Sequence, residues 1–149
     1  MRRYLPFFLT SGTVFALDQV SKALVRAAVI PFHPVEVLDG LFRITLVMNR
    51  GALFGLGQGL SHLFLLVSAL VLLLICFYLP KVKTTTGLVS FGLLAGGAAG
   101  NLADRLRFGA VVDFFDFGYR GWRWPAFNVA DAAITVGVGL LLLRSLRSR

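Results

Sequence analysis

Long apolar runs alternate with two mixed segments along the chain. Four runs are long enough to cross a bilayer, whose hydrocarbon core of about 30 Å needs roughly 20 apolar residues per helix. They cover residues 4–29, 61–79, 87–104 and 128–143. The pattern therefore predicts an all-α membrane protein with four transmembrane helices.

The two segments between these runs are more than plain loops. Residues 35–38 and 41–48 flank Asp39-Gly40, a dipeptide that between apolar runs favours a β-hairpin. The other segment, residues 105–127, is dense in aromatic side chains, which are typical of a membrane interface. We therefore expect a small extracytoplasmic β-hairpin or β-cradle beside an aromatic-rich periplasmic segment.

Composition supports one membrane-embedded domain over residues 1–149. The chain is 57% hydrophobic, more than a soluble domain of this size can bury. Its net charge is +8, from 15 Lys and Arg against 7 Asp and Glu. A basic chain can bind nucleic acid, but here the basic residues flank apolar runs, as in bilayer proteins. We therefore expect membrane lipid and no nucleic acid as a partner, and a monomer.

The basic residues also predict orientation. Four spans place both termini on one side, together with the connection between the second and third spans. That side holds basic residues in short segments beside helix ends, where the positive-inside rule applies; they are Arg2, Arg3, Lys81, Lys83, Arg144, Arg147 and Arg149. We expect both termini in the cytoplasm. We do not expect the first run to be a cleavable signal peptide, because it is long and is interrupted by Asp18 and Lys22.

Several costly polar residues fall at one depth in the predicted spans. At 1.5 Å per residue, Asp18, Asn101, Asp104 and Asp131 all lie about 20–26 Å from the inner ends of their helices. Ionisable side chains in the middle of a span cost about 2.5–3.5 kcal/mol each on insertion scales. Their common level predicts one polar site in the outer leaflet.

Helical spacing predicts which of these residues face each other. Asn101, Asp104 and Arg105 share one side of the third span, and Asn128 and Asp131 share one side of the fourth. Glycines at four-residue spacing, which permit close helix approach, turn Asp104 toward a partner helix; they are Gly92, Gly96 and Gly100. Asp18 and Lys22 are spaced for a salt bridge, a structural role as well supported as a functional one.

Asp113 lies outside the spans, on a segment that the sequence predicts to be extended. Eight residues separate it from Arg105, enough for the chain to fold back and bring Asp113 to Asp131. Two carboxylates that share a site hold one proton, which is the aspartic-protease arrangement and needs no metal or cofactor. Asp116 is the alternative to Asp113, although aromatic residues surround it.

Other chemistries fit less well. His33 and His62 have no ligand spacing around them, which disfavours a zinc site. Ser21 is adjacent to Lys22 and points elsewhere on a helix, which disfavours a Ser–Lys protease. A proton-coupled transporter and a non-catalytic scaffold stay open. A proton path would need ionisable groups through the full thickness, and the inner halves of the first and fourth spans have none.

Five motifs carry a resemblance to a known family. They are Asp18-Gln19-Val20-Ser21-Lys22, Asn49-Arg50-Gly51-Ala52-Leu53-Phe54, the run from Gly96 to Arg105, Val111-Val112-Asp113-Phe114, and Phe127-Asn128-Val129-Ala130-Asp131. In this order on a four-span chain, they resemble lipoprotein signal peptidase (signal peptidase II) over essentially the whole length.

The resemblance implies a function and roles for the matching residues. It implies an aspartic endopeptidase of the bacterial inner membrane that removes the signal peptide from prolipoproteins, cutting before a diacylglyceryl-modified cysteine near the outer leaflet. It implies Asp113 and Asp131 as the catalytic pair and globomycin-type cyclic peptides as inhibitors. It further implies that seven residues support the site or bind substrate: Asp18, Lys22, Asn49, Asn101, Asp104, Arg105 and Asn128.

Overall fold

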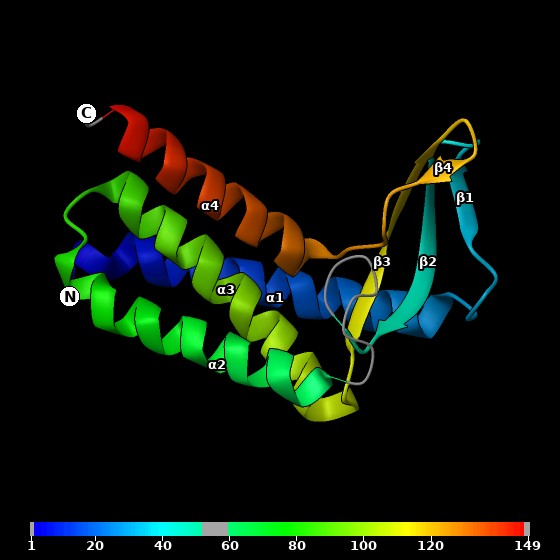
Figure 1. The fold of residues 1–149 in the computed structure, drawn as a ribbon, viewed down its shortest axis with the longest axis horizontal. Coiled ribbons are helices and arrows are strands. Elements are labelled where there is room, and N and C mark those ends of the chain that lie inside the picture. The colour runs from blue at the N-terminus through cyan, green and yellow to red at the C-terminus, as the bar shows by residue number, and fades with distance from the viewer. Residues whose placement is uncertain (1, 52–59, 148–149) are drawn as a thin grey trace.

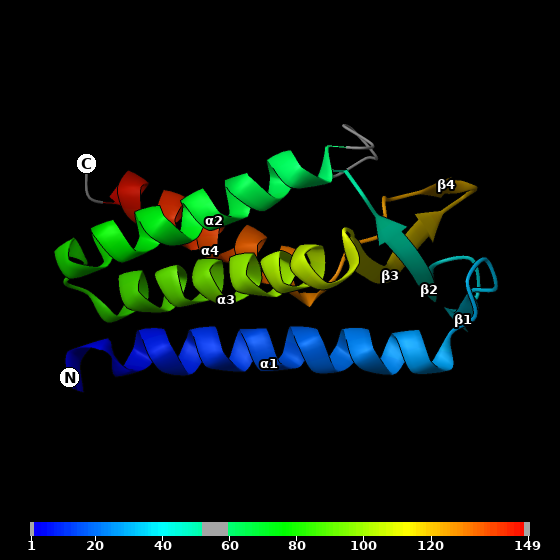
Figure 2. The ribbon, with the colours of Figure 1, turned by 90° about the horizontal axis from the view of Figure 1, so that it is seen from below.

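The computed structural model describes residues 2–51 and 60–147 and places a bundle of helices against one small sheet (Figure 1). The long helices of the described residues are α1 (Leu5–Ala28), α2 (Ser61–Tyr78), α3 (Thr85–Phe108) and α4 (Val129–Arg147). The sheet lies at one end of the bundle, and α1 begins and α4 ends at the other (Figures 1 and 2). The predicted helices all form, and α3 continues to Phe108, beyond its predicted end.

Three helices in the described ranges are long and apolar enough to cross a membrane. They are Ser61–Lys81, Thr85–Phe108 and Val129–Arg147. The first predicted span is a helix of 24 residues but is not among them, since Asp18, Gln19 and Lys22 lower its apolar content. Three of the four expected spans are therefore candidate membrane helices by length and composition.

Glycines on α3 let it pack closely against two neighbours. A Cβ at Gly96 would lie 2.6 Å from the carbonyl oxygen of Ser11 in α1, and one at Gly97 would lie 2.6 Å from that of Ala130 in α4. A Cβ at Gly100 would collide with the Asp18 carboxylate. The predicted glycine ridge thus faces α1, with α4 against the adjoining side of α3.

The sheet has four antiparallel strands in the order β1-β2-β3-β4. They are β1 (Val35–Leu38), β2 (Phe42–Asn49), β3 (Val111–Tyr119) and β4 (Trp122–Arg123). Gly40 adopts a φ of +67° in the first turn, which glycine tolerates without a steric penalty. The predicted hairpin is confirmed, with β2 beginning at Phe42. The pairing of β3 with β2 was not predicted, because it joins residues more than sixty positions apart.

A row of alternating charges crosses the sheet on one face. Glu36, Arg43, Asp116 and Arg123 come from β1, β2, β3 and β4 in turn. The buried Asp116 carboxylate accepts from Arg43 Nε at 2.5 Å and from Arg123 Nε at 2.8 Å. The Arg123 ion pair adds a side-chain contact between the two-residue strand β4 and β3.

We expect Gly97→Ala to lower the free energy of unfolding by about 1–3 kcal/mol, because the added methyl group meets the Ala130 backbone and Ile134. The measurement is thermal or denaturant unfolding in detergent. Gly139→Ala is the matched control, since nothing lies within 4 Å of its Cβ and alanine favours helix. Equal stability of the two variants would contradict the close packing of α3 on α4.

Candidate active site

Lys22 is the centre of a buried polar network between α1 and α3. Its Nζ lies 2.8 Å from Asp18 Oδ2, 2.9 Å from Asp104 Oδ2 and 3.0 Å from Asn101 Oδ1. An ammonium group has three N–H donors, so these three acceptors satisfy it. The residue is 2% exposed, and Asp18 and Asp104 are buried as completely. A buried charge of this kind is tolerated because it is paired and hydrogen-bonded.

The two carboxylates paired with Lys22 also hold the backbone of two other elements. Asp18 Oδ1 accepts from the backbone N–H of Ala130 at 3.0 Å, in the first turn of α4. Asp104 Oδ2 accepts from the backbone N–H of Val112 at 3.0 Å, at the start of β3. Ala130 precedes Asp131 and Val112 precedes Asp113, so the network fixes the backbone beside each predicted catalytic residue.

Asn101 links the Lys22 network to Asp131. Its Oδ1 accepts from Lys22, and its Nδ2 donates to Asp131 Oδ1 at 2.8 Å. The lysine thereby fixes which way the amide points, with its donor toward the carboxylate.

Asn128 joins the two predicted catalytic carboxylates. Its Nδ2 donates to Asp113 Oδ1 at 2.7 Å, and its Oδ1 accepts from the backbone N–H of Asp131 at 2.9 Å. Asp131 Oδ2 accepts in return from the backbone N–H of Asn128 at 3.3 Å. This reciprocal pair is a capping box at the start of α4, with Asn128 as N-cap. The same side chains begin the helix and orient the carboxylates.

A small polar cavity lies between the two carboxylates. It has a volume of about 40 Å³ and is lined by Asn49, Gly51, Asn101, Arg105, Val111, Asp113 and Asp131. Asn49 Nδ2 donates to Asp113 Oδ2 at 2.9 Å, and Asn49 Oδ1 accepts from the backbone N–H of Gly51 at 2.9 Å. A cavity of this size with several polar partners is large enough for a water molecule.

The surroundings of Asp113 favour its protonated form. Burial raises the pKa of Asp113 to about 7, and the nearby Asp131 carboxylate adds to the rise. Hydrogen bonds from Asn49 and Asn128 act in the opposite direction. A carboxyl group that keeps its proton near neutral pH can donate it to a substrate oxygen.

Comparison with known proteins places this arrangement in a family. The family described as Signal peptidase (SPase) II matches residues 10–147. The lipoprotein signal peptidase of Desulforapulum autotrophicum is 47% identical over 137 residues, which cover 87% of this chain and 85% of that protein. The one from Halothermothrix orenii is 40% identical over 132 residues, covering 87% and 88%. The chain belongs to the signal peptidase II family.

Two solved structures of bacterial membrane enzymes share the fold. One has a TM-score of 0.87 at 31% identity and covers 95% of this chain and 87% of that one. The other has a TM-score of 0.84 at 30% identity and covers 96% and 94%. Signal peptidase II enzymes are aspartic proteases that remove signal peptides from prolipoproteins.

The structure brings all nine predicted site residues of this signal peptidase II chain into one connected region. Asp18, Lys22 and Asp104 form the ion network, and the others line the polar cavity or bond to its carboxylates. Arg105 is four residues from Asn101 and lines the polar cavity with it, as their helical spacing had predicted. Its Nη2 lies 3.5 Å from the Gly51 carbonyl oxygen, and its guanidinium lies over the Phe64 ring. Residues 52–54 of the second motif lie outside the described residues.

Asp116 is separated from the candidate pair. It is three residues from Asp113 on the same strand and so projects from the opposite face of the sheet, where the two arginines bind it. Within the described ranges, no group of three His, Cys, Asp or Glu side chains is placed to hold a metal ion.

Sequence reasoning assigned no role to Gln19. Its Nε2 lies within 3.2 Å of Asp18 Oδ2, the Gly100 carbonyl oxygen and Asp104 Oδ1, while its Oε1 accepts from Arg107 Nη1 at 2.8 Å. Its position next to Asp18, as a polar residue within a predicted span, could have indicated a role in the polar site. The Asn128-x-x-Asp131 spacing was likewise a readable capping signal.

We expect Lys22→Met to lower the free energy of unfolding by about 3–5 kcal/mol, because it leaves two buried carboxylates without their cation. The measurement is unfolding in detergent. Lys83→Met, at an exposed lysine, is the control and should leave stability unchanged. A Lys22→Met protein as stable as the control would show that the network does not hold the fold together.

Proposed function

We propose that this chain cleaves prolipoproteins with Asp113 and Asp131 as its catalytic pair, before a cysteine that carries diacylglyceryl. The observation that carries this proposal is the shared polar cavity, in which both carboxylates and three amide or guanidinium side chains converge. The substrate class follows from the family, and the assignment of the pair follows from the cavity and the hydrogen bonds.

In the proposed reaction, ionised Asp131 accepts a proton from a water molecule in the polar cavity. The water oxygen bonds to the carbonyl carbon of the scissile peptide, while protonated Asp113 donates its proton to the carbonyl oxygen. The resulting diol collapses as its C–N bond breaks. Asp131 then returns its proton to the leaving amine, and Asp113 recovers its own from the diol. No metal or cofactor takes part.

Neighbouring groups keep this pair in position. Asn101 and the backbone of Asn128 bind Asp131, while Asn49 and the Asn128 side chain bind Asp113. Arg105, whose guanidinium lines the cavity, supplies a donor for a substrate carbonyl oxygen. Such fixed dipoles stabilise developing charge without reorganisation during the reaction.

We further propose that α1 is the fourth transmembrane span. It has 24 residues, about 36 Å at helical rise, and lies alongside α3 (Figure 2). Asp18 and Lys22 are buried against α3 and so do not face lipid. The charged residues that lower the hydropathy of α1 therefore lie inside the helix bundle.

The proposed orientation has both termini in the cytoplasm of a bacterium and the sheet on the outer side of the inner membrane. Basic residues near the start of α1, around the α2–α3 connection and at the end of α4 lie at the bundle end opposite the sheet (Figure 1). The polar cavity then lies near the outer leaflet. We propose a monomer that globomycin-type cyclic peptides inhibit.

Asp113→Asn and Asp131→Asn should each reduce cleavage of a lipidated prolipoprotein in detergent by at least about a hundredfold, because each removes an acid or base. Both variants should remain folded and bind substrate. Asp116→Asn is the control, since its side chain is on the other face of the sheet and should keep turnover. Near-normal cleavage by either variant of the pair would remove that residue from the mechanism.

The rate should also fall above pH about 7, because Asp113 must carry its proton to act as the acid. Above its pKa the loss approaches tenfold per pH unit in kcat/KM. Asn49→Ala should move this alkaline limb to higher pH, since the Asn49 hydrogen bond lowers the pKa of Asp113. A limb at the same pH in both proteins would assign it to another group.

A further inference from the structure

Basic side chains from three parts of the chain meet at the end of the bundle opposite the sheet. Arg3 lies just before α1, Lys81 lies in the α2–α3 connection, and Arg144 lies three residues before the end of α4. These segments come together at that end in both ribbon views (Figures 1 and 2). The Arg3 guanidinium donates to the carbonyl oxygen of Val82, the residue after Lys81. Arg3, Lys81 and Arg144 are here called the basic cluster.

Arg144 reaches the α2–α3 connection from α4. A Cβ at Gly87, in the first turn of α3, would lie 2.5 Å from Arg144 Nη1 and 2.7 Å from Val82 Cγ1. The Arg144 guanidinium and the Val82 side chain therefore lie against the same glycine. Val82 thus has Arg3 on its carbonyl oxygen and Arg144 beside its side chain, which brings the charges of the cluster together.

The described helices carry no acidic side chain near the basic cluster. Neither Asp nor Glu occurs from the start of α2 to Asp104 in α3. The first acidic residue of α1 is Asp18, about 20 Å from the start of that helix at helical rise, and Asp131 lies about 20 Å from Arg144 in α4. A counter-charge for the cluster must therefore come from another molecule, and phospholipid head groups supply one at a membrane surface.

An apolar pocket lies beside the cluster, between α2 and α3. It has a volume of about 140 Å³ and is lined by Val71, Leu74, Ile75, Tyr78 and Phe91. Ile75 is buried, whereas Leu74 and Tyr78 are each 47% exposed, so the pocket opens on the outside of the bundle. It lies on Ser61–Lys81, which has the highest mean hydropathy of the three candidate spans. This α2–α3 pocket is therefore placed to face hydrocarbon.

Lys81 connects the basic cluster to the α2–α3 pocket. Its Nζ lies 4.7 Å from the centroid of the Tyr78 ring, which lines the pocket, and 4.6 Å from that of Phe77. These cation–π contacts hold the ammonium group beside the inner end of the pocket. A positive charge next to an apolar pocket matches a phospholipid, in which an anionic phosphate adjoins long acyl chains.

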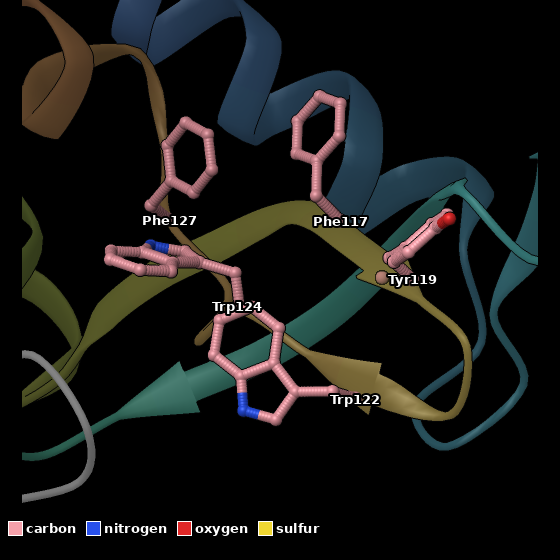
Figure 3. Close-up of a pocket in the computed structure, with 6 residues that line it drawn as sticks. Phe117, Tyr119, Trp122, Trp124 and Phe127 are labelled. Atoms are coloured by element: carbon pink, nitrogen blue, oxygen red, sulfur yellow. The ribbon is translucent and has the colours of Figure 1, made fainter.

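The sheet end of the molecule differs in its charges. An aromatic pocket there is lined by Phe117, Gly118, Tyr119, Trp122, Trp124 and Phe127 (Figure 3). The Arg123 guanidinium lies against Gly118 but is already paired with Asp116. The sheet therefore supplies acidic partners for its own arginines, and charge complementarity favours the other end of the bundle for an anionic ligand.

We propose that the basic cluster and the α2–α3 pocket together bind one anionic phospholipid, with its phosphate beside Lys81 and an acyl chain against Leu74 and Tyr78. Burial of the acyl chain in an apolar pocket is favourable. An acidic protein segment would match the charge, but the pocket would leave its backbone N–H and C=O groups unpaired. The proposed orientation assigns the site to the inner leaflet, while the site itself depends on neither that orientation nor the catalytic pair.

The first test measures lipid binding to the purified chain by native mass spectrometry in detergent. We expect one dioleoyl-phosphatidylglycerol to bind about tenfold more tightly than zwitterionic dioleoyl-phosphatidylethanolamine. Lys81→Gln should weaken binding of the anionic lipid about fivefold, because it removes one charge beside the phosphate. Arg120→Gln is the matched control, since Arg120 is also an exposed cation over a tyrosine that lines an apolar pocket, but at the sheet end.

The second test fills the α2–α3 pocket. Leu74→Trp places a larger side chain at an exposed position of the pocket, and Leu73→Trp is the control on the same helix, 68% exposed and outside the pocket. We expect Leu74→Trp to weaken binding of dioleoyl-phosphatidylglycerol about tenfold and to leave binding of the dihexanoyl form unchanged, because the short chains do not need the pocket. Leu73→Trp should bind both lipids as the wild type does.

Two sets of results would overturn the proposal. Equal binding of the two dioleoyl lipids, or equal effects of the Leu73 and Leu74 variants, would indicate only the general lipid shell of a membrane protein. Unchanged binding in Lys81→Gln, or an equal loss in Arg120→Gln, would show that the basic cluster does not hold the phosphate. Binding is measured without substrate, so none of these outcomes bears on the proposed catalytic pair.

Discussion

The structure depends on one buried cation. Lys22 satisfies its three donors with groups from α1 and α3, and the two carboxylates among them continue to the first turn of α4 and the start of β3. Three helices and the sheet therefore meet at a single charge. An ion pair exposed to water contributes little to folding stability. Here the charges are buried, so removing one partner would leave the other charge desolvated and unpaired, which is strongly destabilising. The fold and the candidate site are consequently the same set of contacts.

Helical periodicity predicted much of this arrangement because it acts locally. The depth of Asp18, Asn101, Asp104 and Asp131 along their helices was enough to place them at one level, and the glycine ridge indicated which side of α3 approaches another helix. Both inferences use only rise and turn per residue. The Asp39-Gly40 hairpin was readable for the same reason.

The remaining parts depend on contacts between distant residues, which a single sequence does not encode in a readable pattern. The pairing of β2 with β3 is one, and it carries Asp113 to Asn49 across the sheet. The contacts of Arg105 with the Gly51 carbonyl oxygen and the Phe64 ring are another example, since they join distant parts of the chain. The two-arginine environment of Asp116 likewise required the register of three strands.

The capping box at the start of α4 has a consequence for how this enzyme can change. In many enzymes the catalytic groups destabilise the folded protein, so that replacing them gives a more stable but inactive protein. Here Asn128 and Asp131 satisfy each other's backbone N–H groups and begin a helix while they orient the pair. With Asp131 in its proposed catalytic role, activity and stability depend on the same atoms, so a substitution here cannot raise stability at the expense of activity. Mutational drift at these two positions is opposed twice, once by selection on turnover and once by selection on folding.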